Sequence, residues 1–208
     1  MSEFAGLFID NLLQTSWPEF VAVVFGLLSV WFSKKVNILV FPTGIVSVLI
    51  YVYICYMAGI YADMGINILY FVMSVYGWYR WTHPRKDKQL PKVAFSTRKE
   101  HAIAAILTIV SFFVLVYVLG NFTDSTVVYL DSSTTSVFIT GMWLMAIKKV
   151  ENWLYWIIGD LVSVPLYFHK GLAFTGVQFT VFLIIAVAGY LAWRNIALNE
   201  KVHRDHRA

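Results

Sequence analysis

The sequence predicts an all-α polytopic membrane protein with seven transmembrane helices, and three observations lead to this fold class. First, the 208-residue chain is 59% hydrophobic and only 13% charged, whereas soluble domains carry about 25% charged residues. Second, apolar runs of near-spanning length follow one another almost to the last residue, more than a single soluble core would bury. Third, Lys and Arg concentrate in alternate connections between these runs, which is the bias of cytoplasmic loops.

Seven apolar runs define the predicted helices in chain order. They cover residues 17–33, 37–56, 62–81, 101–119, 128–147, 152–169 and 172–193. A bilayer core takes about 20 helical residues, so the first and sixth helices are short. Ahead of them, the N-terminal segment 1–16 lacks the basic region and cleavage pattern of a secretory signal. Its polar and aromatic side chains fall on different sides of a helix, so it is either a short interfacial helix or a frayed end.

The basic residues orient the chain in the membrane. Fifteen of the sixteen Lys and Arg residues fall on one side: in the connection after residue 33, at the end of the third helix (Arg80), in the basic loop 82–100, in the connection after residue 147 and in the tail 194–208. The other side carries only Lys170, together with acids such as Asp63 and Asp131. We therefore expect the N-terminus outside and the C-terminus in the cytoplasm. The pI of about 9.1 follows from these loops, so no nucleic-acid partner is expected.

The two halves of the chain show a weak internal repeat. A shift of 112 residues pairs Trp31 with Trp143, Gly59 with Gly171, Gly77 with Gly189, and Trp81 with Trp193. Chance matching of common residues is the alternative, but the pairs are ordered, which favours a repeat. Residues 17–81 would form the first three-helix unit and residues 120–193, with their preceding loop, the second. The linker helix 101–119 makes the two units parallel, and substrate sites in such proteins lie where repeats meet.

A polar stripe runs along the sixth predicted helix. At 100° per residue, Trp153, Trp156, Asp160, Ser163 and Tyr167 fall within about 80° of one another. Asp160 lies roughly 10 Å from the inner helix end at 1.5 Å per residue. An ionised carboxylate at that depth costs several kcal/mol unless it meets a partner or a cavity, which favours a binding site over a structural hydrogen bond. For the two tryptophans alone, an interfacial aromatic belt is the stronger interpretation.

Of this stripe, Trp153, Trp156, Asp160 and Tyr167 are assigned to the candidate substrate site, and polar side chains on other helices complete it. They are Asn67, Tyr70 and Ser74 on the third helix, Thr134 and Thr135 on the fifth, and Gln178 on the seventh. The threonines are weaker candidates because threonine readily bonds its own helix backbone. Aromatic faces attract cations, and amide and hydroxyl groups bond polar substituents. The site therefore fits a ligand with a flat or cationic ring and several hydroxyls.

Other membrane classes fit the chain less well. A retinal protein needs a lysine in its seventh helix, and residues 172–193 contain none. A receptor gains no support from a parallel repeat. The five histidines lie near helix ends or in loops without ligand spacing, and Cys55 is the single cysteine, so no catalytic residue, metal site or cofactor is expected.

Trp153, Trp156 and Asp160 form the motif Trp-x-x-Trp-x-x-x-Asp. This motif resembles the signature Trp-x-x-Trp-x-x-x-Asp/Asn of the PnuC family of nicotinamide riboside (vitamin B3) transporters. The segments 67–70 and 76–79 resemble the family's third-helix pattern, and residues 131–135 resemble its fifth-helix entrance. The resemblance covers roughly residues 18–195. One departure is Ser74, which stands where the family often has a glutamine.

The resemblance implies a 3+1+3 bundle related to the SWEET sugar transporters and assembled as a homotrimer with one pathway per protomer. It also implies facilitated diffusion in the bacterial cytoplasmic (inner) membrane, made one-way by a cytosolic riboside kinase. Nicotinamide riboside contains a pyridinium cation, which fits the aromatic side chains and the Asp160 carboxylate of the polar stripe. Transport of another vitamin such as thiamine, and a proton-coupled carrier with Asp160 as relay, remain alternatives.

Overall fold

The all-α prediction is confirmed by the computed structural model of the chain. It describes residues 6, 16–84, 90–123, 127–169 and 173–205, so the N-terminal segment 1–16 lies almost wholly outside the described residues, as does Lys170. The described part contains seven helices and no strand: α2 (Trp17–Lys34), α3 (Val40–Met57), α4 (Tyr61–Thr82), α5 (Arg98–Phe122), α6 (Val128–Ala146), α7 (Asn152–His169) and α8 (Ala173–Asp205).

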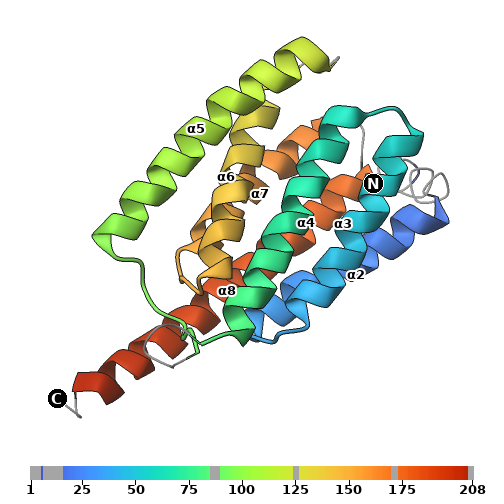
Figure 1. Cartoon of the computed structure of the whole chain (residues 1–208). Coiled ribbons are helices and arrows are strands. Elements are labelled where there is room, and N and C mark those ends of the chain that lie inside the picture. Colours follow the sequence, from blue (N-terminus) through green and yellow to red (C-terminus); the bar gives the residue numbers. More distant parts are fainter. Residues whose placement is uncertain (1–5, 7–15, 85–89, 124–126, 170–172, 206–208) are drawn as a thin grey trace.

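Six of the helices close a ring, and the seventh lies outside it. α3 packs between α2 and α4, and α7 packs between α6 and α8. The two groups meet twice, because α4 packs on α6 and α2 packs on α8 (Figure 1). α5 crosses the outside of the bundle and packs mainly on α6. It exposes large apolar side chains such as Ile106, Ile109 and Phe113, as a lipid-facing helix does.

Hydropathy separates the helices into two kinds. Four described segments are long and apolar enough to cross a membrane by length and composition: Trp17–Lys34, Val40–Met57, Arg98–Phe122 and Ala173–Val202. The remaining described helices, α4, α6 and α7, are less apolar because they carry polar and acidic side chains, Asp63, Asp131 and Asp160 among them. Helices that line a polar pathway are expected to have this composition.

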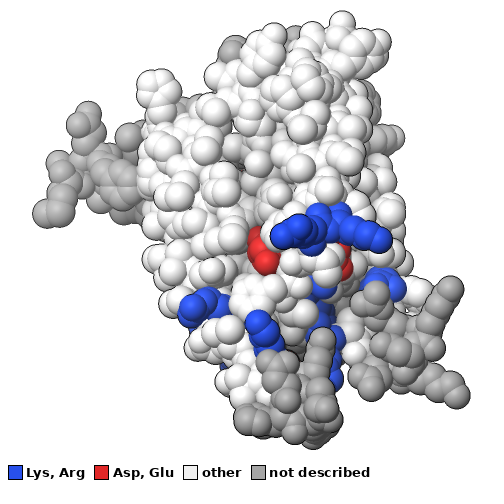
Figure 2. Space-filling model, turned by 90° about the vertical axis from the view of Figure 1, so that its left-hand side faces the viewer, with Lys and Arg blue, Asp and Glu red and all other residues white. Residues whose placement is uncertain are grey.

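All but one of the predicted helix boundaries lie within three residues of the observed ones. α5 begins at Arg98 instead of residue 101, because Thr97 and Glu100 form a capping box that starts the helix earlier. α8 continues to Asp205, twelve residues beyond the predicted end at 193. This extension contains no Gly or Pro, the residues that most often end a helix. On the face shown in Figure 2, Lys and Arg gather towards one end of the molecule.

The turns that follow α2 and α6 are equivalent at the 112-residue shift. Val36 and Lys148 have positive φ values of 53° and 57°, which non-glycine residues seldom adopt. The Val36 N–H donates to the Ser33 carbonyl and the Lys148 N–H donates to the Met145 carbonyl, each at 2.9 Å. The same uncommon turn therefore occurs at the same offset in both halves.

A pair of buried tryptophans joins the two groups of helices at the basic end. Trp81 Nε1 on α4 donates to the Met145 carbonyl at 3.2 Å. Trp193 Nε1 on α8 donates to the Ser33 carbonyl at 3.0 Å. All four residues are related by the shift of 112, so each group supplies one indole and one carbonyl to the other. These two hydrogen bonds hold the basic end of the ring closed.

Two glycines let large rings pack closely beside these tryptophans. A Cβ on Gly77 would lie 2.8 Å from Phe41 Cζ, and one on Gly189 would lie 2.6 Å from Trp153 Cζ2. Phe41 meets Trp81 edge-on at 5.0 Å between ring centroids, and Trp153 meets Trp193 edge-on at 5.7 Å. Both glycines therefore serve close packing at equivalent places in the two halves.

The loop before α5 is attached to the turn between α6 and α7. The Ala94 N–H donates to the Lys148 carbonyl at 3.1 Å, and the Val150 N–H donates back to the Ala94 carbonyl at 3.1 Å. Ser96 donates from its backbone N–H and from its hydroxyl to the Glu151 carboxylate. Lys149 pairs with the Glu100 carboxylate at 2.9 Å. This end of the predicted basic loop is thus ordered against the second group of helices.

Candidate functional site

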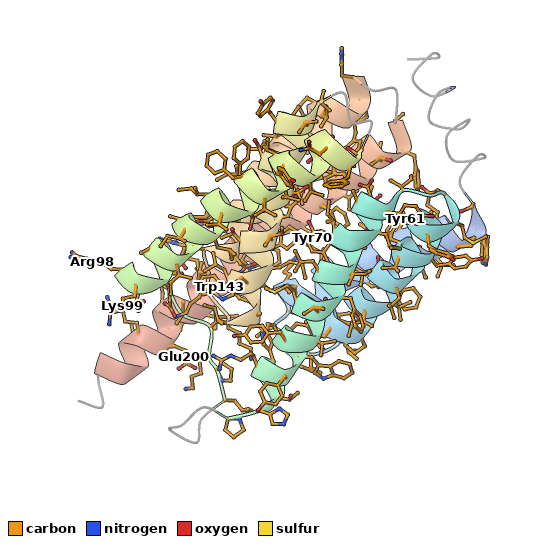
Figure 3. All side chains as sticks on the ribbon, turned by 45° about the horizontal axis from the view of Figure 1, so that its top comes forward. Tyr61, Tyr70, Arg98, Lys99, Trp143 and Glu200 are labelled. Atoms are coloured by element: carbon orange, nitrogen blue, oxygen red, sulfur yellow. The ribbon has the colours of Figure 1, made fainter. Side chains whose placement is uncertain are left out.

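The larger of the two described cavities lies at the end of the bundle opposite the basic residues and has a volume of about 730 Å³. Its walls come from α4, α6, α7, α8 and the last residues of α5. Tyr61 and Tyr70 on α4 lie towards this end, while Arg98, Lys99 and Glu200 lie towards the other (Figure 3). A cavity of this size accommodates a small organic ligand.

Two carboxylates give the cavity its electrostatic character. Asp63 at the start of α4 and Asp131 in the first turn of α6 both line it. No Lys or Arg belongs to the described lining. Like charges in a low-dielectric cleft focus the field, so this arrangement attracts a cation and repels an anion.

Aromatic rings form the deeper wall of the cavity. Tyr167 of α7 stacks on Phe179 of α8, with ring centroids 4.9 Å apart. Phe138 of α6 lies 6.2 Å from Phe179 and stacks on Trp156 of α7 at 5.3 Å. Phe138, Tyr167 and Phe179 line the cavity. Planar rings and cations bind favourably to such faces.

Four of the ten predicted site residues line this cavity, namely Tyr70, Thr134, Thr135 and Tyr167. The Thr134 hydroxyl donates to the Leu130 and Asp131 carbonyls of its own helix, each at 3.1 Å, as expected for a threonine within a helix. The other six residues, Asn67, Ser74, Trp153, Trp156, Asp160 and Gln178, lie outside the lining.

The side chains of two of these six residues form hydrogen bonds outside the cavity. The Asn67 amide donates to the Asp63 carbonyl at 2.9 Å, one turn earlier in its own helix. The Gln178 side chain hydrogen-bonds the Tyr51 hydroxyl on α3. Ser74 is buried between α4 and α3, where its hydroxyl lies 3.9 Å from the position of a Cβ on Gly44.

Asp160 and Trp156 lie immediately behind the aromatic wall. Ser163, one turn further along α7, lines the cavity, whereas Asp160 is 2% exposed. No hydrogen bond or ion pair joins the Asp160 carboxylate to another described residue. Trp156 contacts Phe138, which separates it from the cavity. The predicted acid thus sits one helical turn inward of the cavity floor.

Trp153 occupies a different environment from the rest of its stripe. It is 1% exposed and packs in the core with Trp193 and against Gly189. Its Nε1 has no hydrogen-bond partner among the described residues. In this conformation Trp153 supports the contact between the two groups of helices.

Some cavity residues were absent from the predicted site. Asp63 and Asp131 were noted only as outer acids, and Ser163 only as a member of the polar stripe. Phe138 and Phe179 gave no signal, because a phenylalanine facing a cavity and one facing lipid look alike in a sequence. The polar stripe of α7 correctly predicted which face of the helix lines the cavity. It did not predict how deep along the helix the cavity extends.

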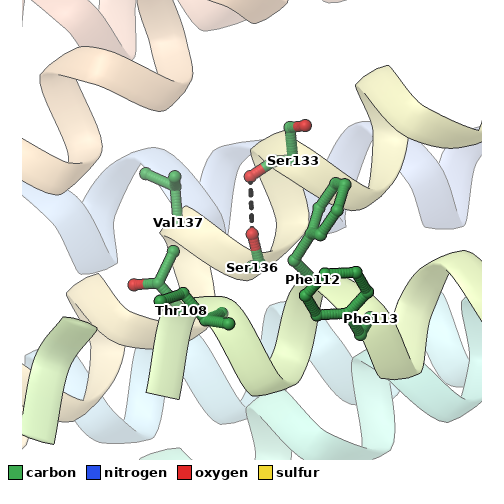
Figure 4. Close-up of a pocket in the computed structure, with 7 residues that line it drawn as sticks. Thr108, Phe112, Phe113, Ser133, Ser136 and Val137 are labelled. Atoms are coloured by element: carbon green, nitrogen blue, oxygen red, sulfur yellow. Dashed lines mark hydrogen bonds between the residues drawn. The ribbon is translucent and has the colours of Figure 1, made fainter. Parts of the chain in front are cut away.

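A second, smaller cavity of about 230 Å³ lies between α5 and α6 (Figure 4). Its lining is mostly apolar and includes Phe112, Phe113 and Val137. The Ser136 hydroxyl there donates to the Ser133 carbonyl of its own helix at 2.8 Å. None of the predicted site residues lines it. Across the described residues, no group of three or more His, Cys, Asp or Glu side chains forms a metal site.

Comparison with known proteins identifies the family. Residues 16–195 match the nicotinamide mononucleotide transporter family. Two similar relatives are both named nicotinamide riboside transporter PnuC. The protein from Escherichia coli is 25% identical and matches 88% of this chain and 87% of its own length. The protein from Neisseria mucosa is 28% identical, over 92% of this chain and 76% of its own.

The chain belongs to the PnuC family of membrane transporters. A crystal structure of the vitamin B3 transporter PnuC superimposes with a TM-score of 0.71 at 25% identity, covering 95% of this chain and 88% of that one. A riboflavin/roseoflavin transporter, RibM of Streptomyces davaonensis, is 25% identical over 92% of this chain and 90% of its own length. The PnuC resemblance of the sequence motifs is thereby confirmed, and these relatives are transporters, not enzymes.

Proposed function

We propose that this PnuC chain transports nicotinamide riboside. Relatives with that name match nearly its whole length. The cavity adds a chemical reason, because two carboxylates and several aromatic rings suit a cationic pyridinium attached to a sugar. This combination of charge and stacking surface is the observation that carries the proposal.

The cavity favours the riboside over the corresponding mononucleotide. The mononucleotide adds a phosphate, which binds best to Arg, Lys or clustered backbone N–H groups. The described lining instead presents Asp63 and Asp131. A phosphate beside these carboxylates would be repelled, whereas the positive ring of the riboside would be attracted.

We further propose that the deeper predicted residues join the site as the ligand moves inward. Asp160 and Trp156 are one turn below the cavity floor, and Asp160 is the counter-ion that a cation would meet there. Asn67, Ser74, Gln178 and Trp153 would line later parts of the path or brace it. The equivalent contacts at the 112-residue shift support a 3+1+3 parallel-repeat bundle, in which a path between the two repeats is expected.

The proposed membrane arrangement follows the charge distribution. The cavity would open to the outside and the basic end would face the cytoplasm of the bacterial inner membrane. Each protomer contains its own complete cavity, so a homotrimer would have three independent pathways. Transport would be uncoupled, with a cytosolic kinase phosphorylating the riboside and preventing its return.

Two alternatives have specific support. The similarity to RibM raises riboflavin as a substrate, and thiamine is another cationic heteroaromatic vitamin that suits the cavity. A proton-coupled carrier is supported by the buried carboxylate of Asp160, because such acids also serve as proton relays.

Uptake into liposomes distinguishes these candidates. Purified protein should take up labelled nicotinamide riboside saturably, with excess riboside competing better than nicotinamide mononucleotide, thiamine or riboflavin. Saturable uptake of another vitamin, without uptake of the riboside, would reject the substrate assignment. An imposed proton gradient should not drive riboside accumulation, since accumulation would show coupling.

A further inference from the structure

The Phe138 ring lies between the cavity and Trp156 of α7. The ring lines the cavity on one side and stacks on Trp156 on the other. Ser163 of α7 reaches the cavity, while Asp160, one turn inward, is buried. A ligand in the cavity therefore meets the Phe138 ring before it can meet Trp156, and Asp160 lies outside the cavity lining as well.

A glycine on the facing helix provides the place where this ring rests. A Cβ on Gly159 would overlap Phe138 Cε1, and would lie 2.6 Å from Cζ and 2.8 Å from Cδ1. Real Cβ atoms do not approach a ring so closely, so the ring packs directly on the backbone of α7 only because residue 159 has no side chain. Gly159 immediately precedes Asp160, so the ring lies against the helical turn that carries the acid.

The first half of the chain makes the same helix contact without a ring. The positions 112 residues earlier are Gly26 on α2 and Ser47 on α3. A Cβ on Gly26 would lie 3.3 Å from Ser47 Oγ, and that hydroxyl donates to the Ala22 carbonyl at 2.8 Å. Small residues suffice to pack the two helices there. The large ring at position 138 is thus an addition of the second half, on the side where the carboxylate lies.

We propose that Phe138 is the gating side chain of the outer cavity. Its ring, seated on Gly159, separates a bound ligand from Trp156 and Asp160, and the ligand advances when the ring leaves that seat. The ring also offers the ligand a stacking face, because Phe138 lies beside Phe179 in the cavity wall. The role of this gate in transport rests on the proposed function. Whether the ring shields Asp160 can be tested without any vitamin.

Cysteine accessibility tests the gate directly. The single native thiol, Cys55, is first replaced by serine. Asp160→Cys and, as a matched control on the same helix, Ser163→Cys are then introduced, each with Phe138 or with Phe138→Ala. Right-side-out membrane vesicles are treated with a membrane-impermeant methanethiosulfonate reagent, and the labelling rate is measured.

With Phe138 present, Ser163→Cys should be labelled readily and Asp160→Cys slowly. Phe138→Ala should accelerate labelling of Asp160→Cys by about tenfold or more, the factor that about 1.4 kcal/mol represents, and should leave Ser163→Cys nearly unchanged. Equal labelling of the two cysteines with Phe138 present would overturn the proposal. So would slow labelling of Asp160→Cys after the ring is removed.

A second comparison guards against variants that fail to fold. Gly159→Ala should lower the melting temperature of the purified protein, because its methyl group displaces the ring. Adding Phe138→Ala to Gly159→Ala should restore much of that loss, since the methyl group then has space. If the double variant is less stable than both single variants, the ring does not rest on Gly159 as described. Loss of riboside uptake with a normal labelling pattern would reject the transport function and leave the gate intact.

Discussion

The paired indole hydrogen bonds at the basic end make a quantitative prediction about stability. Trp81→Phe removes the donor to the Met145 carbonyl at 3.2 Å, and Trp193→Phe removes the donor to the Ser33 carbonyl at 3.0 Å. Each carbonyl keeps its backbone partner, at 2.9 Å in both cases, so no acceptor becomes unsatisfied. The hydrogen bond then contributes about 1 kcal/mol, and the smaller buried ring costs roughly 1 kcal/mol more.

We therefore expect each variant to lower the free energy of unfolding by about 2 kcal/mol, and the two losses to be similar. Unfolding in mixed micelles, followed by tryptophan fluorescence, measures both. Trp78→Phe is the matched control, since Trp78 lies on α4 one turn before Trp81 and is 41% exposed. If either variant is as stable as the control, the paired bonds do not hold the two groups of helices together.

Three further predictions address packing, charge and pH. Gly77→Ala should destabilise the protein by about 1–3 kcal/mol through overlap with Phe41, whereas Gly65→Ala on the same helix, with open space around it, should be neutral or stabilising in the same unfolding assay. Asp160→Asn should weaken binding of nicotinamide riboside more than binding of its reduced, uncharged form, measured by calorimetry; equal losses would indicate a structural role. Burial lowers the pKa of Lys148 below its ordinary 10.5. At pH values between this lowered pKa and 10.5, the folded state therefore binds fewer protons than the unfolded state. Stability should rise with pH across that window, and Lys148→Met should flatten this rise; an unchanged pH profile would exclude Lys148 as its source.

Much of the fold could be predicted because hydropathy and charge report on the bilayer. Each of the seven predicted helices is found among the described residues, and every predicted boundary except the end of α8 lies within three residues of the observed one. The repeat offset of 112 was also visible, since Gly77, Gly189, Trp81 and Trp193 are fixed by close packing in the observed structure. The late end of α8 could not be predicted from hydropathy, because the helix continues after its apolar run stops.

The candidate site was harder to predict than the fold. Helical periodicity places Asp160, Ser163 and Tyr167 on one face of α7, and the structure agrees for the two residues that reach the cavity. Periodicity contains no information on depth, so Asp160 below the floor and Ser163 above it looked alike. The wall residues Phe138 and Phe179 depend on contacts between helices distant in sequence, which a single sequence does not encode locally.

Counterflow in liposomes tests the central claim, uncoupled transport of nicotinamide riboside, most directly. Vesicles containing the protein and loaded with unlabelled riboside are diluted into a trace of labelled riboside without any ion gradient. Transient accumulation of label, abolished when the internal riboside is omitted, is the predicted result. Absence of counterflow, together with counterflow of riboflavin or thiamine under the same conditions, would contradict the account.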